Sequence, residues 1–255
     1  MSSSFEYYCP PDLYDVIHSD ITLDIPFWIE QAGATSGAIL ELCCGTGRLL
    51  VPCAEAGARI EGLDLSAAMV EACRAKLAGR GLAAEVGVGD MRRFSRPHRF
   101  QLIFIACNSF QHNETGAQQN ATLRCCREHL EPGGRLMITL FHPSPQRLAQ
   151  LDGTERELKR VPHPRRGGTV RLLDAGRYDR AEQRASFTRT VEWLDPAGVP
   201  LERGERSFEL RYIHKPEMER LMRAAGFGRY ESSPGVDGQG RQEDGELLVW
   251  TAWND

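Results

Sequence analysis

ILELCCGTGRLL, residues 39–50, is the stretch that decides the fold of this chain. Its first four residues form a short apolar run, interrupted by Glu41, of the kind found in central parallel strands. Gly45 and Gly47 then let the backbone turn sharply and approach a ligand without an intervening Cβ atom. From Arg48 onward the pattern suits a helix. A strand, a glycine turn and a helix N-terminus together favour a site for a polar or nucleotide-like ligand at the carboxyl edge of a sheet.

The chain has 255 residues, enough for one large α/β domain or for one domain with an elaboration. Hydrophobic residues make up 41% and charged residues 26%, which is typical of a globular protein. A net charge of −4 gives no electrostatic reason to expect a nucleic-acid partner. The start of the chain lacks a basic-then-apolar leader and the apolar runs are too short to span a bilayer, so we expect no membrane partner and a cytoplasmic location.

Eight cysteines raise the question of a metal site or of disulfides. Cys43–Cys44 and Cys125–Cys126 are adjacent pairs, and the sequence contains no C-x-x-C spacing. Several cysteines fall on apolar faces, where cysteine behaves as a small hydrophobic residue. We therefore expect structural cysteines and no metal.

Strands and helices are predicted to alternate after the glycine turn. The expected strands are 39–42, 58–63, 83–88, 100–106 and 135–141, and the expected helices are 48–56, 67–78 and 115–131. This alternation predicts a parallel sheet with right-handed crossovers. A helix at 215–225 and a hairpin of strands 227–232 and 246–253 follow near the end of the chain. The predicted fold class is α/β: a Rossmann-like, seven-stranded, mostly parallel sheet with a C-terminal antiparallel hairpin, plus an inserted antiparallel β-sheet.

Two further segments frame this core. Residues 12–32 look helical, with Asp12 as a possible N-cap and Pro26 as a break. Residues 151–212 carry β-like runs and charges of both signs, as on a solvated antiparallel face. The expected division is an N-terminal helical lid (1–34), a cofactor-binding core (35–142), an inserted sheet covering the acceptor site (143–212), and a final helix and hairpin completing the core (213–255).

Three acidic residues lie either at the end of a predicted parallel strand or within a predicted buried strand. Asp64 ends the second strand, where a carboxylate can accept both hydroxyls of a ribose, although a helix-capping role is the alternative. Asp90 ends the third strand and could bind an adenine amine while Met91 packs on the ring; the alternative is a plain turn aspartate. Glu41 lies in a buried strand and needs a cationic partner, which a ligand ammonium group would supply.

Leu50 stands where a G-x-G-x-x-G motif would have its third glycine, which disfavours a nicotinamide or flavin enzyme.

These motifs resemble those of class I S-adenosylmethionine-dependent methyltransferases. The matching segments are ELCCGTGR (41–48), GLDLS (62–66), GDM (89–91), NSFQH (108–112) and LEPGGRLMI (130–138). The resemblance is strongest to the small-molecule group that includes ubiquinone/menaquinone, glycine-sarcosine and amino-sugar N-methyltransferases. It covers residues 12–142 well and the final helix and hairpin moderately. The family usually has glycine where this chain has Cys43.

The resemblance implies that the cofactor is S-adenosyl-L-methionine and the product S-adenosyl-L-homocysteine. It also implies cofactor-binding roles for residues at the turn, at the strand ends and in the lead-in helix. These are Tyr14, Glu41, Gly45, Thr46, Gly47, Asp64, Leu65, Asp90, Met91 and Asn108.

The expected activity is methyl transfer to the N or O of a small-molecule acceptor, for which the protein mainly positions and desolvates the acceptor. His112 follows the fourth strand and is the catalytic candidate, as a general base; a packing or hydrogen-bonding histidine is the alternative. His142 is the second candidate, and His18 and Tyr212 could help line the acceptor pocket.

Two other functions stay open at this point. One is methylation of RNA or protein, although the near-neutral insert counts against RNA. The other is a catalytically inactive regulatory protein that binds S-adenosylmethionine. The expected partner is a small-molecule acceptor, and the chain could act as a monomer or a homodimer.

Overall fold

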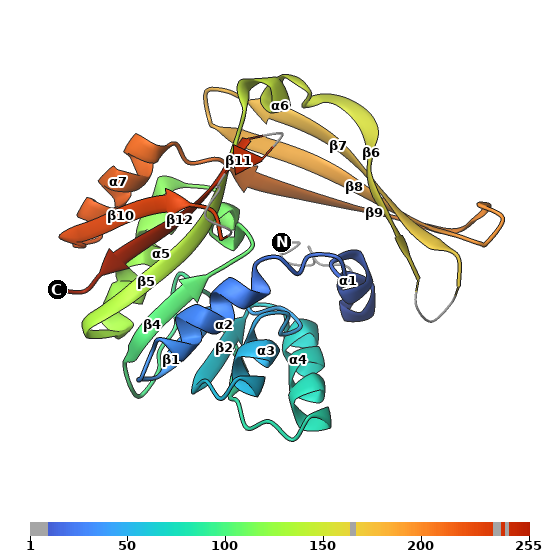
Figure 1. The fold of residues 1–255 in the computed structure, drawn as a ribbon. Helices are drawn as coiled ribbons and strands as arrows, with labels where there is room; N and C mark the ends of the chain where they lie inside the picture. The colour runs from blue at the N-terminus through green and yellow to red at the C-terminus, as the bar shows by residue number, and fades with distance from the viewer. Residues whose placement is uncertain (1–9, 164–166, 237–240, 243–244) are drawn as a thin grey trace.

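The computed structural model describes residues 10–163, 167–236, 241–242 and 245–255. Its main sheet has the order β10-β12-β5-β4-β1-β2-β3, and a short β11 pairs with β12 (Figure 1). The strands are β1 (Ile39–Leu42), β2 (Ile60–Asp64), β3 (Val86–Val88), β4 (Phe100–Ile105), β5 (Leu130–Pro143), β10 (Arg229–Pro234), β11 (Arg241–Gln242) and β12 (Gly245–Trp253).

The pairing directions confirm the predicted fold class. β1 lies parallel to β2 and β4, and β4 lies parallel to β5. β12 is antiparallel to β5 and to β10, which is the predicted C-terminal hairpin. Most strand and helix boundaries lie within a few residues of the expected ones, although β5 is considerably longer than the expected 135–141.

Helices cover both faces of this sheet. On one face, α2 (Ile25–Gly33), α3 (Leu50–Glu55) and α4 (Ala67–Gly79) pack against residues such as Ile39 and Phe104. On the other face, α5 (Gly116–His129) and α7 (Lys215–Ala224) pack against residues such as Leu40. Because successive residues of a strand point to opposite faces, the central strand β1 is buried along its whole length. The glycine turn therefore starts from a strand that is buried on both faces.

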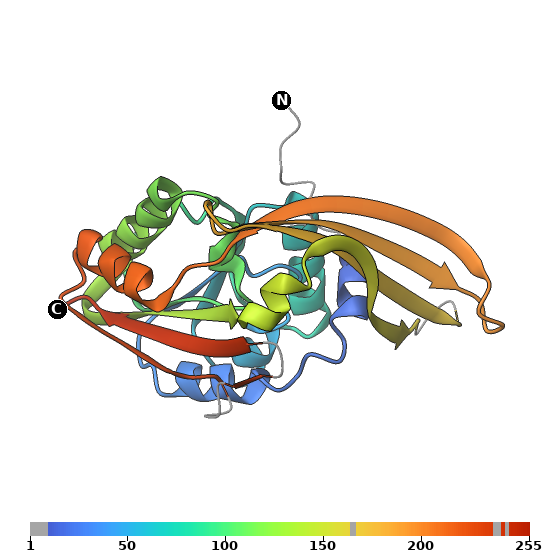
Figure 2. The ribbon, with the colours of Figure 1, turned by 90° about the horizontal axis from the view of Figure 1, so that it is seen from above.

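The second sheet is antiparallel, with the order β6-β7-β8-β9. Its strands are β6 (Asp152–Pro162), β7 (Thr169–Asp179), β8 (Arg184–Leu194) and β9 (Pro200–Arg211), and α6 (Pro145–Ala149) connects them to β5. Figures 1 and 2 show this sheet projecting from the end of β5 and arching beside the carboxyl ends of the parallel strands. The β-like runs within 151–212 lie at 168–173, 185–194 and 205–213 and overlap β7, β8 and β9, whereas no run was predicted at 152–162.

The lead-in forms two helices, α1 (Pro11–Ile17) and α2, rather than one. Pro26 lies in the first turn of α2, as expected for a residue that restarts a helix. The prediction that Asp12 caps the first helix is wrong: Pro10 holds the N-cap position and Asp12 lies within the first turn. Residues 1–9 of the expected lid, and part of the expected loop before the last strand, lie outside the described residues. In the described part of the chain, no helix is long and apolar enough to cross a membrane.

Candidate functional site

The glycine turn after β1 has a left-handed backbone at three positions. Cys43, Gly45 and Gly47 have φ values of 60°, 54° and 84°. A Cβ atom at Gly47 would lie 2.6 Å from Cys73 Sγ and 2.9 Å from Val51 Cγ2, so only glycine fits there. Cys43 adopts the conformation that glycine takes most easily, and its Sγ donates to Met91 Sδ at 3.7 Å. The thiol thus links the turn to the end of β3.

Asp64 ties the turn to the next strand end. Its Oδ2 accepts the Gly45 N–H at 2.8 Å, and its Oδ1 accepts the Ser66 N–H at 2.9 Å. The side chain is buried; this burial raises the pKa of the carboxyl, while the backbone N–H groups act in the opposite direction. Ser66 caps α4 by accepting the Met69 N–H. Asp64 is therefore held rigidly by the turn that it faces.

Asp90 is held by its own neighbour. The Arg92 guanidinium donates to Asp90 Oδ1 through Nε at 2.8 Å and to Oδ2 through Nη2 at 2.8 Å. Partial burial acts to raise the pKa of Asp90, but the hydrogen bonds from Arg92 prevail and keep that pKa below its usual value. The carboxylate is thus ionised and fixed at the end of β3.

Two acceptor atoms near the turn have no hydrogen-bond partner within the described ranges: Glu41 Oε2 and Asn108 Oδ1. Burial raises the pKa of Glu41 well above its usual value, although the nearby Arg48 acts to lower it. Asn108 follows β4 with a left-handed backbone, φ 60°. A buried acceptor without a donor costs about 1–3 kcal/mol. A ligand that carries N–H groups would remove that cost.

The lead-in helix α1 is fastened to the turn. The fully buried Thr46 donates from Oγ1 to Asp15 Oδ1 at 2.6 Å, and Lys76 forms an ion pair with Asp15 at 2.7 Å. Tyr14 stacks on His18, with ring centroids 4.0 Å apart. The Tyr14 ring also lies 3.9 Å from the position of a Cβ atom built on Gly45. Tyr14 therefore lies beside the turn.

Two cavities open between the strand ends and the second sheet. The larger, about 680 Å³, extends from the ends of β2 and β3 to the hydroxyl-bearing side of β8 and β9. Its lining includes Cys43, Asp64, Leu65, Asp90, Met91, Arg92, Glu114, Ser186, Thr188, Ser207 and Glu209. The smaller, about 230 Å³, is lined by residues that include Tyr14, His18, Asn108, Gln111, Phe141, Arg189, Arg206 and Tyr212.

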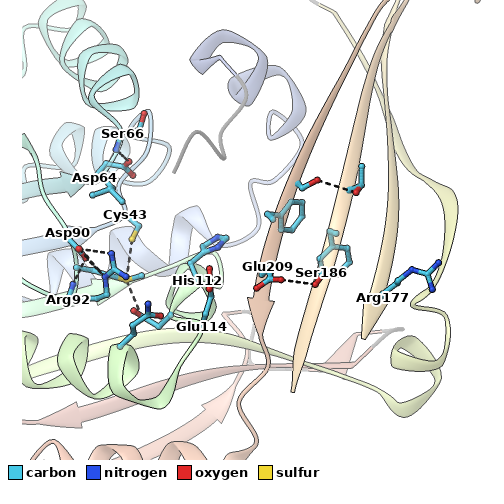
Figure 3. Close-up of a pocket in the computed structure, with 18 of the residues that line it drawn as sticks. Cys43, Asp64, Ser66, Asp90, Arg92, His112, Glu114, Arg177, Ser186 and Glu209 are labelled. Atoms are coloured by element: carbon cyan, nitrogen blue, oxygen red, sulfur yellow. Dashed lines mark hydrogen bonds and ion pairs between the residues drawn. The ribbon is translucent and has the colours of Figure 1, made fainter. Parts of the chain in front are cut away.

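His112 and Phe208 line both cavities, so they mark the junction between them. Figure 3 shows His112 between the strand-end residues and Glu209 on β9. Burial lowers the pKa of His112 to about 4, while a hydrogen bond to the Glu209 backbone acts to raise it. The imidazole is therefore neutral at physiological pH and has a lone pair that can accept a proton.

The other histidine candidates differ in position. His18, whose pKa burial also lowers to about 4, lines the smaller cavity together with Tyr212. Burial likewise lowers the pKa of His142 to about 4, but His142 lines neither cavity. Neither lining includes Glu41, Gly45, Thr46 or Gly47.

The structure adds residues that the sequence did not indicate. Ser186, Ser207 and Glu209 come from the second sheet, where no motif marks them. Arg48, predicted only as part of a helix, joins the lead-in to the site. Its guanidinium binds both oxygens of Asp24 at 2.6 Å each and also donates to Cys107 Sγ. The motif ELCCGTGR (41–48) contains Arg48, but no pattern in the sequence marks Asp24, 24 residues earlier, as its partner.

Residues 39–134 match a family model described as a methyltransferase domain. Among curated proteins, the chain is 28% identical over 134 residues to dTDP-3-amino-3,6-dideoxy-alpha-D-glucopyranose N,N-dimethyltransferase of Streptomyces fradiae. That match covers 50% of this chain and 51% of the relative. The chain thus spans about half the length of the curated relatives it matches.

Two solved structures show the fold over nearly the whole chain. An S-adenosylmethionine-dependent methyltransferase from Clostridium acetobutylicum has a TM-score of 0.77 at 17% identity, covering 94% of this chain and 96% of that one. S-adenosylmethionine-bound CalS10, an amino pentose methyltransferase from Micromonospora echinaspora, has a TM-score of 0.70 at 23% identity, covering 96% and 97%. At these identities the likeness establishes the fold, including the second sheet, and nothing about substrates.

Proposed function

We propose that this chain is a class I S-adenosylmethionine-dependent methyltransferase that methylates an amine nitrogen of a small, hydroxyl-rich acceptor. The match of residues 39–134 to a methyltransferase-domain model supports this proposal. The observation that carries this proposal is the convergence of the glycine turn, Asp64 and Asp90 at one sheet edge beside His112. The amino-sugar N,N-dimethyltransferase among the relatives suggests an amino sugar as the acceptor.

The residues present fit the cofactor. Asp64 and Asp90 offer carboxylate oxygens to hydroxyl and amine donors along the wall of the larger cavity. Glu41 Oε2 and Asn108 Oδ1 are the unpartnered acceptors that an amino-acid ammonium group would satisfy. When bound, S-adenosylmethionine supplies a methyl group activated by its sulfonium sulfur.

The chain's own part in the reaction is to position the acceptor and to take its proton. His112 is neutral at physiological pH, so its imidazole can accept the proton that the nitrogen releases once it has been methylated. Its pKa of about 4 makes it a weak base, so the proton would pass on to water. Phe208 borders the junction and Tyr14 lines the smaller cavity beside it, so their rings would help to exclude water from a bound acceptor. We retain the division into an N-terminal lid (1–34), core (35–142), insert over the acceptor (143–212) and closing segment (213–255), because cavity linings come from the first three.

The hydroxyl groups of Ser186, Thr188 and Ser207, together with the Glu209 carboxylate, suit an acceptor with several hydroxyls and a basic nitrogen. Ser186 donates to Glu209 at 3.0 Å, so this polar group is already ordered. Thr188 and Ser207 also hydrogen-bond to each other at 3.4 Å. An acceptor with hydroxyl groups would extend this network, whereas a flat apolar acceptor would gain no hydrogen bonds from it.

The test has two stages. Calorimetry with S-adenosylmethionine, S-adenosylhomocysteine and a nicotinamide dinucleotide should show heat for the first two only. Turnover is then followed by mass spectrometry on amino sugars, hydroxylated aromatic acceptors, RNA and a peptide mixture, with the amino sugars expected to gain methyl groups. Methylation of RNA or peptide instead, or binding without turnover on any acceptor, would refute the proposed function. The expected cytoplasmic location and lack of a nucleic-acid partner stay predictions.

A further inference from the structure

His112 lies in a short segment that is held from both sheets. The segment begins as the 3₁₀ helix η1 (Ser109–His112), shortly after β4. Gln111 is buried and donates from Nε2 to the Phe141 carbonyl of β5 at 2.8 Å. The next residue, His112, hydrogen-bonds through its imidazole to the Glu209 backbone of β9. Two neighbouring residues are thus fastened to different sheets, so the place of the imidazole depends on both.

The residue after His112 is fastened to α5. Asn113 is fully buried, and its carbonyl accepts from Gln119 Nε2 at 3.0 Å. Its side-chain oxygen accepts from Thr122 Oγ1 at 3.1 Å, and its Nδ2 donates to Met91 Sδ at 3.7 Å. The contact with Met91 is weak, because a thioether sulfur is a poor acceptor. The chain beside His112 is therefore fixed mainly to the helix.

Gln119 continues the connection back to the second sheet. Its side chain is fully buried, and its Oε1 accepts from Arg211 Nη1 at 3.0 Å. Arg211 is the last residue of β9, two positions after Glu209, and its Nη2 forms an ion pair with Glu217 of α7 at 2.7 Å. The Gln119 amide has one usable orientation. A flip would turn its N–H groups toward the guanidinium and its oxygen toward the Asn113 carbonyl.

These contacts form a closed ring that begins and ends on β9. The contact ring runs in the order Glu209, His112, Asn113, Gln119 and Arg211. Its two ends lie only two residues apart on β9, so the same short piece of strand holds His112 both directly and through α5. Buried polar networks whose members are all hydrogen-bonded make a structure rigid. The contact ring should therefore restrict the imidazole to one position.

We propose that Gln119 and Arg211 are positioning residues that hold His112 at the junction of the two cavities. Neither residue lines a cavity, so both act through the contact ring rather than on a bound acceptor. Because Arg211 belongs to β9, the place of the imidazole depends on how the second sheet sits against the core. The kinetic consequence rests on the proposed function, whereas the positioning itself can be tested without turnover.

The kinetic test uses Gln119→Met, which keeps the size of the side chain and removes both hydrogen bonds. We expect kcat to fall about 10-fold, because a proton acceptor displaced by about 1 Å is less effective. Calorimetry should show S-adenosylmethionine affinity changed by less than about 2-fold, since only the weak Met91 contact is affected. In a His112→Ala background the same substitution should cause no further fall in kcat. An equal fall in both backgrounds would mean that Gln119 acts independently of His112, and would overturn the proposal.

The second readout is the pKa of the His112 imidazole, measured by NMR on histidine-labelled protein without cofactor or acceptor. Wild type should titrate near the value of about 4 that burial imposes. Gln119→Met should move this pKa toward the ordinary 6.5, because a loosened imidazole becomes hydrated. The kcat still falls, since the base is stronger but misplaced. Arg211→Lys keeps the charge without the planar fork and should shift the pKa in the same direction to a smaller extent.

Gln101→Met is the matched control. Gln101 also holds the chain, because it accepts the Gly37 N–H at 2.6 Å, but it lies at the amino end of β4 and away from the site. Its loss should leave both kcat and the His112 pKa unchanged. An unchanged His112 pKa in folded Gln119→Met and Arg211→Lys, as judged by thermal melting, would overturn the proposal. If wild type methylates no acceptor, a shifted pKa still supports the positioning and only the proposed function fails.

Discussion

His112 is the residue on which the proposed chemistry depends most directly. It borders both cavities and is neutral at physiological pH because burial lowers its pKa to about 4. Replacing it with alanine removes the proton acceptor while leaving the strand-end residues in place. We expect His112→Ala to lower kcat by about 100-fold with little change in S-adenosylmethionine affinity.

His98→Ala is the matched control for this variant. His98 pairs with Glu61 at 2.8 Å and lines neither cavity, so its loss should leave kcat unchanged. If His112→Ala retained its full turnover number, the base assignment would be wrong and positioning alone would account for the reaction.

Asp64 carries a second prediction at the residue scale. Its carboxylate faces the larger cavity and also accepts the Gly45 and Ser66 N–H groups. Asp64→Ala loses charge-assisted hydrogen bonds to the ligand and loosens the turn, so we expect cofactor affinity to fall about 30- to 100-fold by calorimetry. Glu55→Ala, which removes a half-exposed partner of Arg80, should leave that affinity unaltered. Equal affinities for Asp64→Ala and wild type would argue against the strand-end carboxylate as a cofactor ligand.

Side chains at strand ends could be predicted because the parallel topology fixes where strands end. Asp64, Leu65, Asp90 and Met91 all line the larger cavity for that reason. The clamp of Arg92 on Asp90 and the left-handed backbone of Asn108 depend on local geometry that the sequence pattern does not encode. The predicted cofactor contacts therefore stay predictions, while the placement of these residues at one edge is a structural finding.

At the scale of elements, the clearest new feature is how α1 is held. Asp15 receives a hydrogen bond from Thr46 and an ion pair from Lys76 of α4, so one carboxylate joins three parts of the chain. Asp15→Ala removes both contacts. We expect weaker cofactor binding, by about 10-fold, and faster proteolysis of the lead-in (18–24), because Tyr14 would no longer be held beside Gly45.

The exposed Asp12, on the same helix, is the control for this variant. Asp12→Ala should leave both the proteolysis rate and the affinity unchanged, since Asp12 makes neither contact. A proteolysis rate for Asp15→Ala equal to that of wild type would show that apolar packing of Val16 and Ile17 against the second sheet holds α1 instead.

Elements of the core could be predicted because their hydrophobic periods are strong, whereas β6 could not. Its sequence, DGTERELKRVP, is mostly charged, and most of its side chains are exposed. Such a strand is defined by its hydrogen bonds to β7 and by ion pairs rather than by a buried face. The existence of β6 depends on long-range pairing with β7, which a pattern along the chain does not reveal.

At the scale of the whole molecule, stability should depend on pH through three half-buried histidines. Burial lowers the pKa values of His18, His112 and His142 to about 4 from an ordinary value near 6.5. The unfolded chain therefore takes up protons between about pH 6.5 and pH 4 that the folded chain excludes. Stability from these groups is fully present above pH 6.5 and is lost as the pH falls toward 4.

Glu41 acts in the opposite direction. Its raised pKa lets the folded protein take up a proton while the unfolded glutamate is still ionised, so its contribution increases as the pH falls. With three histidines opposed by Glu41 and by Asp64, whose pKa burial also raises, we expect the urea midpoint to drop between pH 7 and pH 5. His142→Gln, which lies outside both cavities, should make that drop smaller, whereas Glu41→Gln should make it larger. Because both variants replace the ionisable group with a neutral amide, a pH dependence unchanged in both would mean that other titrating groups control acid stability.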